Sequence, residues 1–235
     1  MKNSYARALT VFVIALAMPL FAQASDTLVK KEHYSGFLKD YSQLKEEKDA
    51  KGNEVMRYIS PALTSGKYHK VMIDRVVYYP APKPDPHVDM TTLNQIRDYL
   101  TKELRQKIGA QVPVVNQPGP DVIRMHAAIT AVKAENAALK AYQYIPIALI
   151  FQGIKAAAGT RAKDAELYVE MEILDSESGK RLGAVVRKGV GTEVKEEKEG
   201  AEKGKKMVML DNVKPILDNW ADLAAEFVGK NLKAE

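Results

Sequence analysis

The sequence contains no cysteine, and this absence removes several classes of protein from consideration. Disulfide-stapled secreted domains are excluded, and so are metal sites built from thiolates. Acylation at a lipobox cysteine is excluded as well. A chain of 235 residues is nevertheless long enough to bury a hydrophobic core without covalent cross-links.

Apolar runs long enough to cross a membrane are also missing, and the run near the N-terminus is no exception. Two basic residues precede an apolar stretch at 8–18, and Ala22-Gln23-Ala24 places small residues at the −3 and −1 positions of a cleavage site. The run covers about 13 residues at most, fewer than the roughly 20 needed to cross a bilayer. We therefore predict a signal peptide at 1–24, cleavage after Ala24, a periplasmic location and no transmembrane segment in the mature protein.

Charge of one sign is not in excess. The formal net charge of +5 falls to about +3 when Lys2 and Arg7 leave with the signal peptide. Basic and acidic residues are mixed throughout the chain, so the sequence gives no reason to expect nucleic acid as a partner. Peripheral contact of the protein with a membrane remains an alternative.

The mature chain is predicted to hold an N-terminal arm, partly irregular, at 25–66 and one main domain at 67–235. The charged part of the arm, 45–54, is predicted to be a mobile loop. In the main domain, β-branched and alternating patterns predict a central strand at 70–79, a strand at 121–132 and a hairpin at 165–190. Three- and four-residue apolar spacing predicts helices at 91–108, 144–158 and from Asp211 onward.

The order strand, helix, strand, helix, hairpin, helix predicts an α/β (α+β) fold. The simplest arrangement that fits this order is a layered domain in which helices pack on a mixed sheet of four to five strands. The chain then ends in a hairpin and a C-terminal helix.

Three stretches resemble a bacterial envelope family known only as domain of unknown function thirty-three thirteen. They are Ser35-Gly36-Phe37-Leu38 with Asp40-Tyr41-Ser42 and Leu44, Tyr68 to Val76, and Val169 to Ser176 with Gly179. The resemblance covers residues 35–232 and implies an exported protein, often a lipoprotein. It implies no catalytic residues, and the chain departs from the lipoprotein members because it has no lipobox cysteine.

Asp85, His87 and Asp89 form the only local cluster with the chemistry of metal ligands. Alternate side chains of an extended loop can converge, and two carboxylates with an imidazole suit Zn²⁺ or Mn²⁺. The spacing is not an established one and a fourth ligand is missing, so we favour a proline-rich loop whose Asp89 caps the next helix. No metal and no cofactor is predicted.

Two further groups of acid-base residues favour structural interpretations. His126 lies on a predicted strand, and neither a partner residue nor a G-x-S-x-G motif marks it as catalytic. Glu166, Glu170 and Glu172 resemble the paired carboxylates of a glycosidase, but their alternation with apolar residues predicts the solvated face of a hairpin. No catalytic residue is predicted.

A candidate interaction surface consists of apolar and aromatic side chains. The stretch 144–151 suits either a helix buried on most sides or an exposed face for a protein partner or a membrane interface. Two tyrosines before the proline-rich loop suit either a binding groove or cross-strand packing. The residues singled out are Tyr144, Ile147, Leu149, Ile150, Phe151, Tyr78 and Tyr79.

By exclusion, the sequence predicts a non-enzymatic exported envelope protein that serves as an accessory or binding module for another envelope component. The expected partner is another envelope protein. One alternative is a metal-dependent envelope hydrolase that acts through Asp85, His87 and Asp89. The other is a small-ligand-binding periplasmic protein with its pocket under the helix at 144–151.

Overall fold

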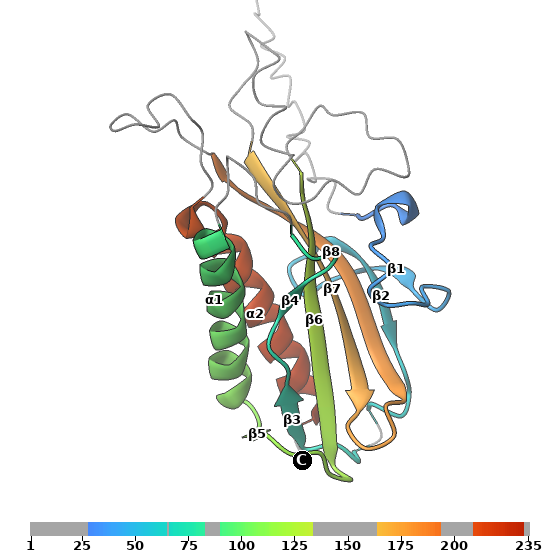
Figure 1. Ribbon diagram of the computed structural model, residues 1–235. Coiled ribbons are helices and arrows are strands. Elements are labelled where there is room, and N and C mark those ends of the chain that lie inside the picture. The colour runs from blue at the N-terminus through green and yellow to red at the C-terminus, as the bar shows by residue number, and fades with distance from the viewer. Residues whose placement is uncertain (1–27, 65, 83–89, 134–163, 194–208, 233–235) are drawn as a thin grey trace, which may run out of the picture.

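The computed structural model describes residues 28–64, 66–82, 90–133, 164–193 and 209–232 (Figure 1). In chain order the elements are η1 (Lys31–His33), β1 (Lys45–Lys48), β2 (Glu54–Ile59), β3 (Lys70–Ile73), β4 (Val77–Tyr78), α1 (Met90–Gly109), β5 (Val114–Val115), β6 (Val122–Lys133), β7 (Asp164–Asp175), β8 (Arg181–Glu193) and α2 (Leu210–Leu232). None of the helices in the described ranges is long and apolar enough to cross a membrane.

The strands form a single mixed sheet with the order β1-β2-β8-β7-β6-β3-β5, and β4 pairs with β6. Strand β3 runs parallel to β5 and β6, whereas β6, β7, β8, β2 and β1 pair antiparallel. The predicted α/β (α+β) class with a mixed sheet is confirmed. The predicted count of four to five strands is too low, because the described residues contribute eight strands to the sheet.

The additional strands come from segments with weak sequence signals. The prediction of a mobile loop at 45–54 is wrong, because β1 and β2 form a hairpin there and β2 pairs with β8. Strand β1 reads KEEK, and such charges are typical of a strand at the exposed edge of a sheet. The predicted central strand at 70–79 divides into β3, which lies beside the edge strand β5, and β4, which pairs with β6.

Both helices pack on the same face of the sheet, as Figure 1 shows. The apolar stripe of α1 that the sequence predicts is buried in this main core. The side chains that the stripe contributes are Leu93, Ile96, Leu100, Leu104 and Ile108. On the sheet, alternate side chains of β6 and β7 belong to the same core, namely Ile123, Met125, Ala127 and Ile129 of β6 and Leu167, Val169 and Ile173 of β7.

The opposite face of the sheet is covered by the segment 29–44. Phe37 and Leu38 of this segment pack with Tyr168 on β7 and with Val186 on β8 in a second, smaller core. The hairpin face that alternation predicted to be solvated is therefore buried at Tyr168 and Glu170. Glu170 on this face has a relative exposure of 0%, which corrects its expected place in solvent.

Helix α2 lies very close to β8 at Gly189. A Cβ atom at this position would clash with Ile216 Cγ2 and lie 3.2 Å from Trp220 Cζ2. The missing side chain therefore lets the first half of α2 lie directly on the strand.

We expect Gly189→Ala to lower the free energy of unfolding by about 1 to 3 kcal/mol, because the new methyl group overpacks the contact with Ile216. Denaturant unfolding measures the change. The double variant Gly189→Ala/Ile216→Ala is the control and should be more stable than the sum of the two single changes predicts. Additive changes would contradict the proposed contact.

Candidate functional site

A groove with a volume of about 360 Å³ lies between the second half of α2 and strands β2, β7 and β8. Its walls are mainly apolar. The sheet contributes Ile59, Met171, Ile173 and Val185, and α2 contributes Trp220, Leu223, Ala224 and Phe227. Because α2 touches β8 at Gly189 but only borders the groove further along, the space opens beside its C-terminal half.

The lining of the groove includes a buried ion pair. Arg187 on β8 is 9% exposed, and its Nη2 donates to the Asp49 carboxylate in the turn between β1 and β2. Burial lowers the pKa of the Arg187 guanidinium, and the charge of Asp49 opposes that effect. The same turn reaches α2, where Lys51 Nζ donates to Asn219 Oδ1.

The sequence analysis did not single out these groove residues. A signal was present in β8, because Arg187 occupies a helix-facing position in phase with Val185 and Gly189. A charged residue at such a position predicts either a buried partner or a ligand.

The Glu170 carboxylate fastens the segment 29–44 to the sheet. Its Oε1 accepts a hydrogen bond of 2.7 Å from the Ser35 N–H, and its Oε2 accepts one of 2.6 Å from the Tyr41 hydroxyl. Burial, reinforced by the hydrogen bond to Glu170, raises the pKa of Tyr41. Both oxygens of the Glu170 carboxylate therefore bind residues of this segment.

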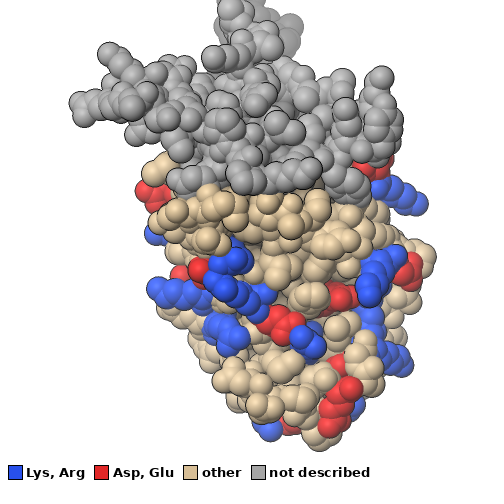
Figure 2. Space-filling view, in the orientation of Figure 1, with Lys and Arg blue, Asp and Glu red and all other residues tan. Residues whose placement is uncertain are grey.

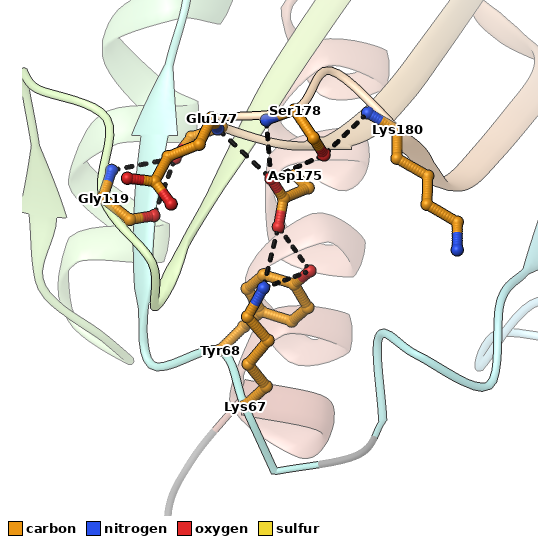
Figure 3. Close-up of polar contacts among 8 residues, drawn as sticks. Lys67, Tyr68, Gly119, Asp175, Glu177, Ser178 and Lys180 are labelled. Carbon is orange, nitrogen blue, oxygen red and sulfur yellow. Dashed lines mark hydrogen bonds and ion pairs between the residues drawn. The ribbon is translucent and has the colours of Figure 1, made fainter.

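Asp175 at the end of β7 organises the turn into β8 (Figure 3). Its Oδ1 accepts hydrogen bonds of 2.8 Å from both the Ser178 N–H and the Ser178 hydroxyl, and Oδ2 accepts one of 2.8 Å from the Tyr68 hydroxyl. Lys67 Nζ lies 3.0 Å from the same Oδ2. The hydrogen bonds from Ser178 and Tyr68 hold the pKa of Asp175 well below its ordinary value.

The stretches that carry the family resemblance therefore meet in space. Glu170 and Asp175 belong to the third stretch, and they bind Ser35 and Tyr41 of the first and Tyr68 of the second. These polar residues of the three stretches therefore hold parts of the fold together.

His126 contacts Glu172 and Phe37. Its Nδ1 lies 3.4 Å from Glu172 Oε1, and its ring centroid lies 4.7 Å from that of Phe37. Glu172 also accepts a hydrogen bond from Arg181. This geometry fits the structural role expected for His126.

Tyr78 and Tyr79, which the sequence analysis grouped in one candidate surface, contact different parts of the structure. The Tyr78 hydroxyl donates a hydrogen bond of 2.8 Å to the Leu93 carbonyl on α1, and burial raises its pKa. Tyr79 is 42% exposed and meets the Phe37 ring edge-on at 5.8 Å between centroids. Neither residue lines the groove beside α2.

The other predicted site residues lie outside the described ranges. These are Tyr144, Ile147, Leu149, Ile150 and Phe151 of the candidate surface, Asp85, His87 and Asp89 of the candidate metal cluster, and the side chain of Glu166. Among the residues that the structure describes, no group of three or more His, Asp or Glu side chains could hold a metal ion.

Basic and acidic side chains lie next to one another on the face shown in Figure 2. A second hollow, bordered by Arg75 and Asp98, illustrates this mixing, because Arg75 Nη2 lies 2.7 Å from Asp98 Oδ1. Arg124 Nε lies 2.8 Å from Asp74 Oδ2 in the same way. These ion pairs offset the basic charge locally.

Comparisons with solved structures give only distant likenesses. The PelC dodecamer from Paraburkholderia phytofirmans is 10% identical, with a TM-score of 0.37, and the match covers 77% of this chain and 98% of that chain. A neuraminyllactose-binding hemagglutinin homologue from Helicobacter pylori is 10% identical, with a TM-score of 0.36 and coverage of 71% and 83%. Likenesses at this level carry no functional conclusion.

Sequence comparisons are far more specific. The uncharacterized lipoprotein YdcL of Escherichia coli strain K12 is 32% identical over 200 residues, which cover 85% of this chain and 87% of that protein. A family model described as "Protein of unknown function (DUF3313)" matches residues 33–224. The chain therefore belongs to the DUF3313 family.

Proposed function

We propose that this protein is a non-enzymatic exported envelope protein that binds another envelope component in the groove beside α2. The groove is the observation that carries the proposal. Its volume of about 360 Å³ falls within the roughly 300 to 1,000 Å³ of ligand sites, and its lining combines apolar walls with a few polar groups.

Two further observations support the proposal. The buried carboxylates of Glu170 and Asp175 are both occupied by hydrogen bonds within the fold, so they are poorly placed to act as general acids or bases. The family relationship to a lipoprotein, together with the predicted signal peptide, supports a place in the envelope.

Photo-crosslinking in cells tests the proposal. A photoreactive amino acid replaces Phe227, which lines the groove, or Gln95, an exposed residue of α1 that serves as the matched control. We expect a crosslinked species only from position 227. The yield should fall when Ala224→Trp fills the groove, since Ala224 also lines it.

Equal yields from positions 227 and 95, or a yield from position 227 that Ala224→Trp leaves unchanged, would argue against binding in the groove. Mass analysis of the crosslinked species tells a protein partner from a small molecule. Circular dichroism of each purified variant confirms that it is folded.

A further inference from the structure

Arg187, a residue of the groove lining, carries an unused hydrogen-bond donor. Arg187 lines the groove, and its Nε is buried without a hydrogen-bond partner among the described residues. A buried donor without a partner is unfavourable, and most such groups bind a protein group, an ordered water or a ligand. The guanidinium of arginine has the planar shape that matches a carboxylate or a phosphate.

Asp49 does not saturate this guanidinium. Its Oδ1 accepts hydrogen bonds of 2.9 Å from the N–H groups of Lys51 and Asn53, and the Asn53 side chain donates to both of its oxygens. Asp49 is thus shared between Arg187 and the turn that it stabilises. The guanidinium therefore keeps the capacity to bind a second anion.

The charges that line the groove favour an anion. The basic residues of the lining are Lys48, Arg57, Arg187 and Lys230, and the acidic residues are Asp49 and Glu226. Arg57 is paired with Glu47 on β1. Positive charge remains in excess after this pairing, which complements a ligand with one negative group.

The remaining lining suits an apolar chain. Met171 and Val185 on the sheet face Leu223 and Phe227 on α2 across the groove. A volume of about 360 Å³ is near the lower end of the range for ligand sites, which favours a single slender chain over a bulky ring system.

We infer that the groove binds an anionic amphiphile whose apolar chain lies between α2 and the sheet and whose carboxylate or phosphate binds Arg187. This inference rests on the proposed function and narrows the class of ligand. A free fatty acid and an anionic phospholipid share the required chemistry.

Trp220 supplies a direct readout, because it lines the groove and is the only tryptophan in the chain. Bromine atoms quench indole fluorescence on contact, so a brominated chain in the groove lowers the fluorescence intensity of Trp220. The probes are 9,10-dibromostearate and, as the neutral match, 9,10-dibromostearyl alcohol. A second arm uses phosphatidylcholine vesicles that contain either brominated phosphatidylglycerol or brominated phosphatidylcholine.

We expect saturable quenching by the brominated acid at concentrations at least about tenfold lower than the alcohol requires, because the charged group adds a strong hydrogen bond. The double variant Asp49→Asn/Arg187→Gln removes both charges of the ion pair together. It should lose about tenfold in affinity for the acid and nothing for the alcohol. Arg124→Gln, on the other face of β6, is the matched control and should bind like the wild type.

If the double variant does not fold, Arg187→Lys replaces it, since lysine keeps the charge beside Asp49 but lacks the Nε–H. A weaker but selective loss of affinity for the acid is then expected. Quenching in only one arm identifies the source as a fatty acid or as a phospholipid.

Absence of quenching in both arms, equal quenching by acid and alcohol, or a folded Arg187 variant with unchanged affinity would overturn the inference. Crosslinking from position 227 still tests the proposed function in that case, because it detects any occupant of the groove.

Discussion

Asp175→Ala should lower the free energy of unfolding by about 2 to 4 kcal/mol, because each buried donor left without an acceptor costs about 1 to 3 kcal/mol and Asp175 accepts from more than one. The change removes the acceptor of the Ser178 N–H and leaves the Tyr68 hydroxyl, 2.8 Å from Oδ2, without its partner. Chemical denaturation measures the loss. A change below about 1 kcal/mol would contradict the central role of this carboxylate in the turn.

Asp175→Asn is the matched control, because it keeps an oxygen for Ser178 and removes the charge. The pKa of Asp175 is lowered in the folded protein, so its ionised form stabilises the fold fully above the pKa of an unfolded aspartate, about 4. This contribution is lost as the pH falls through the lower folded-state pKa. The stability difference between the wild type and Asp175→Asn should therefore shrink as the pH decreases below about 4.

We expect Glu170→Ala to cost about 3 kcal/mol or more and to release the segment 29–44 from the sheet. The change removes the acceptors of the Ser35 N–H and the Tyr41 hydroxyl and leaves a cavity under the second core. Limited proteolysis should cleave within 29–44 before the rest of the domain. The released segment would then expose Tyr168 and Val186 to water.

Glu170→Gln separates charge from hydrogen bonding. The amide oxygen can still accept from the Ser35 N–H and the amide nitrogen can donate to Tyr41, so this variant should retain most of the stability. Protection of 29–44 in Glu170→Ala equal to that in the wild type would show that apolar packing by Phe37 and Leu38 is sufficient without the carboxylate.

The sequence predicted those elements whose periodicity is set by one buried face. The stripe from Leu93 to Ile108 defined α1, and the alternation around Ile123 and Leu167 defined β6 and β7. Strand β1 could not be recognised, because an edge strand made of lysine and glutamate has no apolar face to display.

The burial of Glu170 and the groove beside α2 depend on long-range contacts. Nothing near Glu170 in the sequence indicates that Ser35, 135 positions away, covers that face of the hairpin. The groove depends on the direction in which α2 leaves its contact with Gly189, which no local pattern specifies. Only the charge of Arg187 at a helix-facing position pointed toward it.

The pairing of β2 with β8 has a kinetic consequence. Met56 lies opposite Val186, so the first long strand of the chain cannot join the sheet until nearly the whole domain is present. Closing a loop of that length costs conformational entropy before the contacts between the two strands can form and stabilise it. Such topologies fold slowly, in milliseconds to seconds. A chain threaded from its N-terminus would therefore hold its first hairpin unpaired while β8 is still arriving, with the free edge of β2 open to association in the interval.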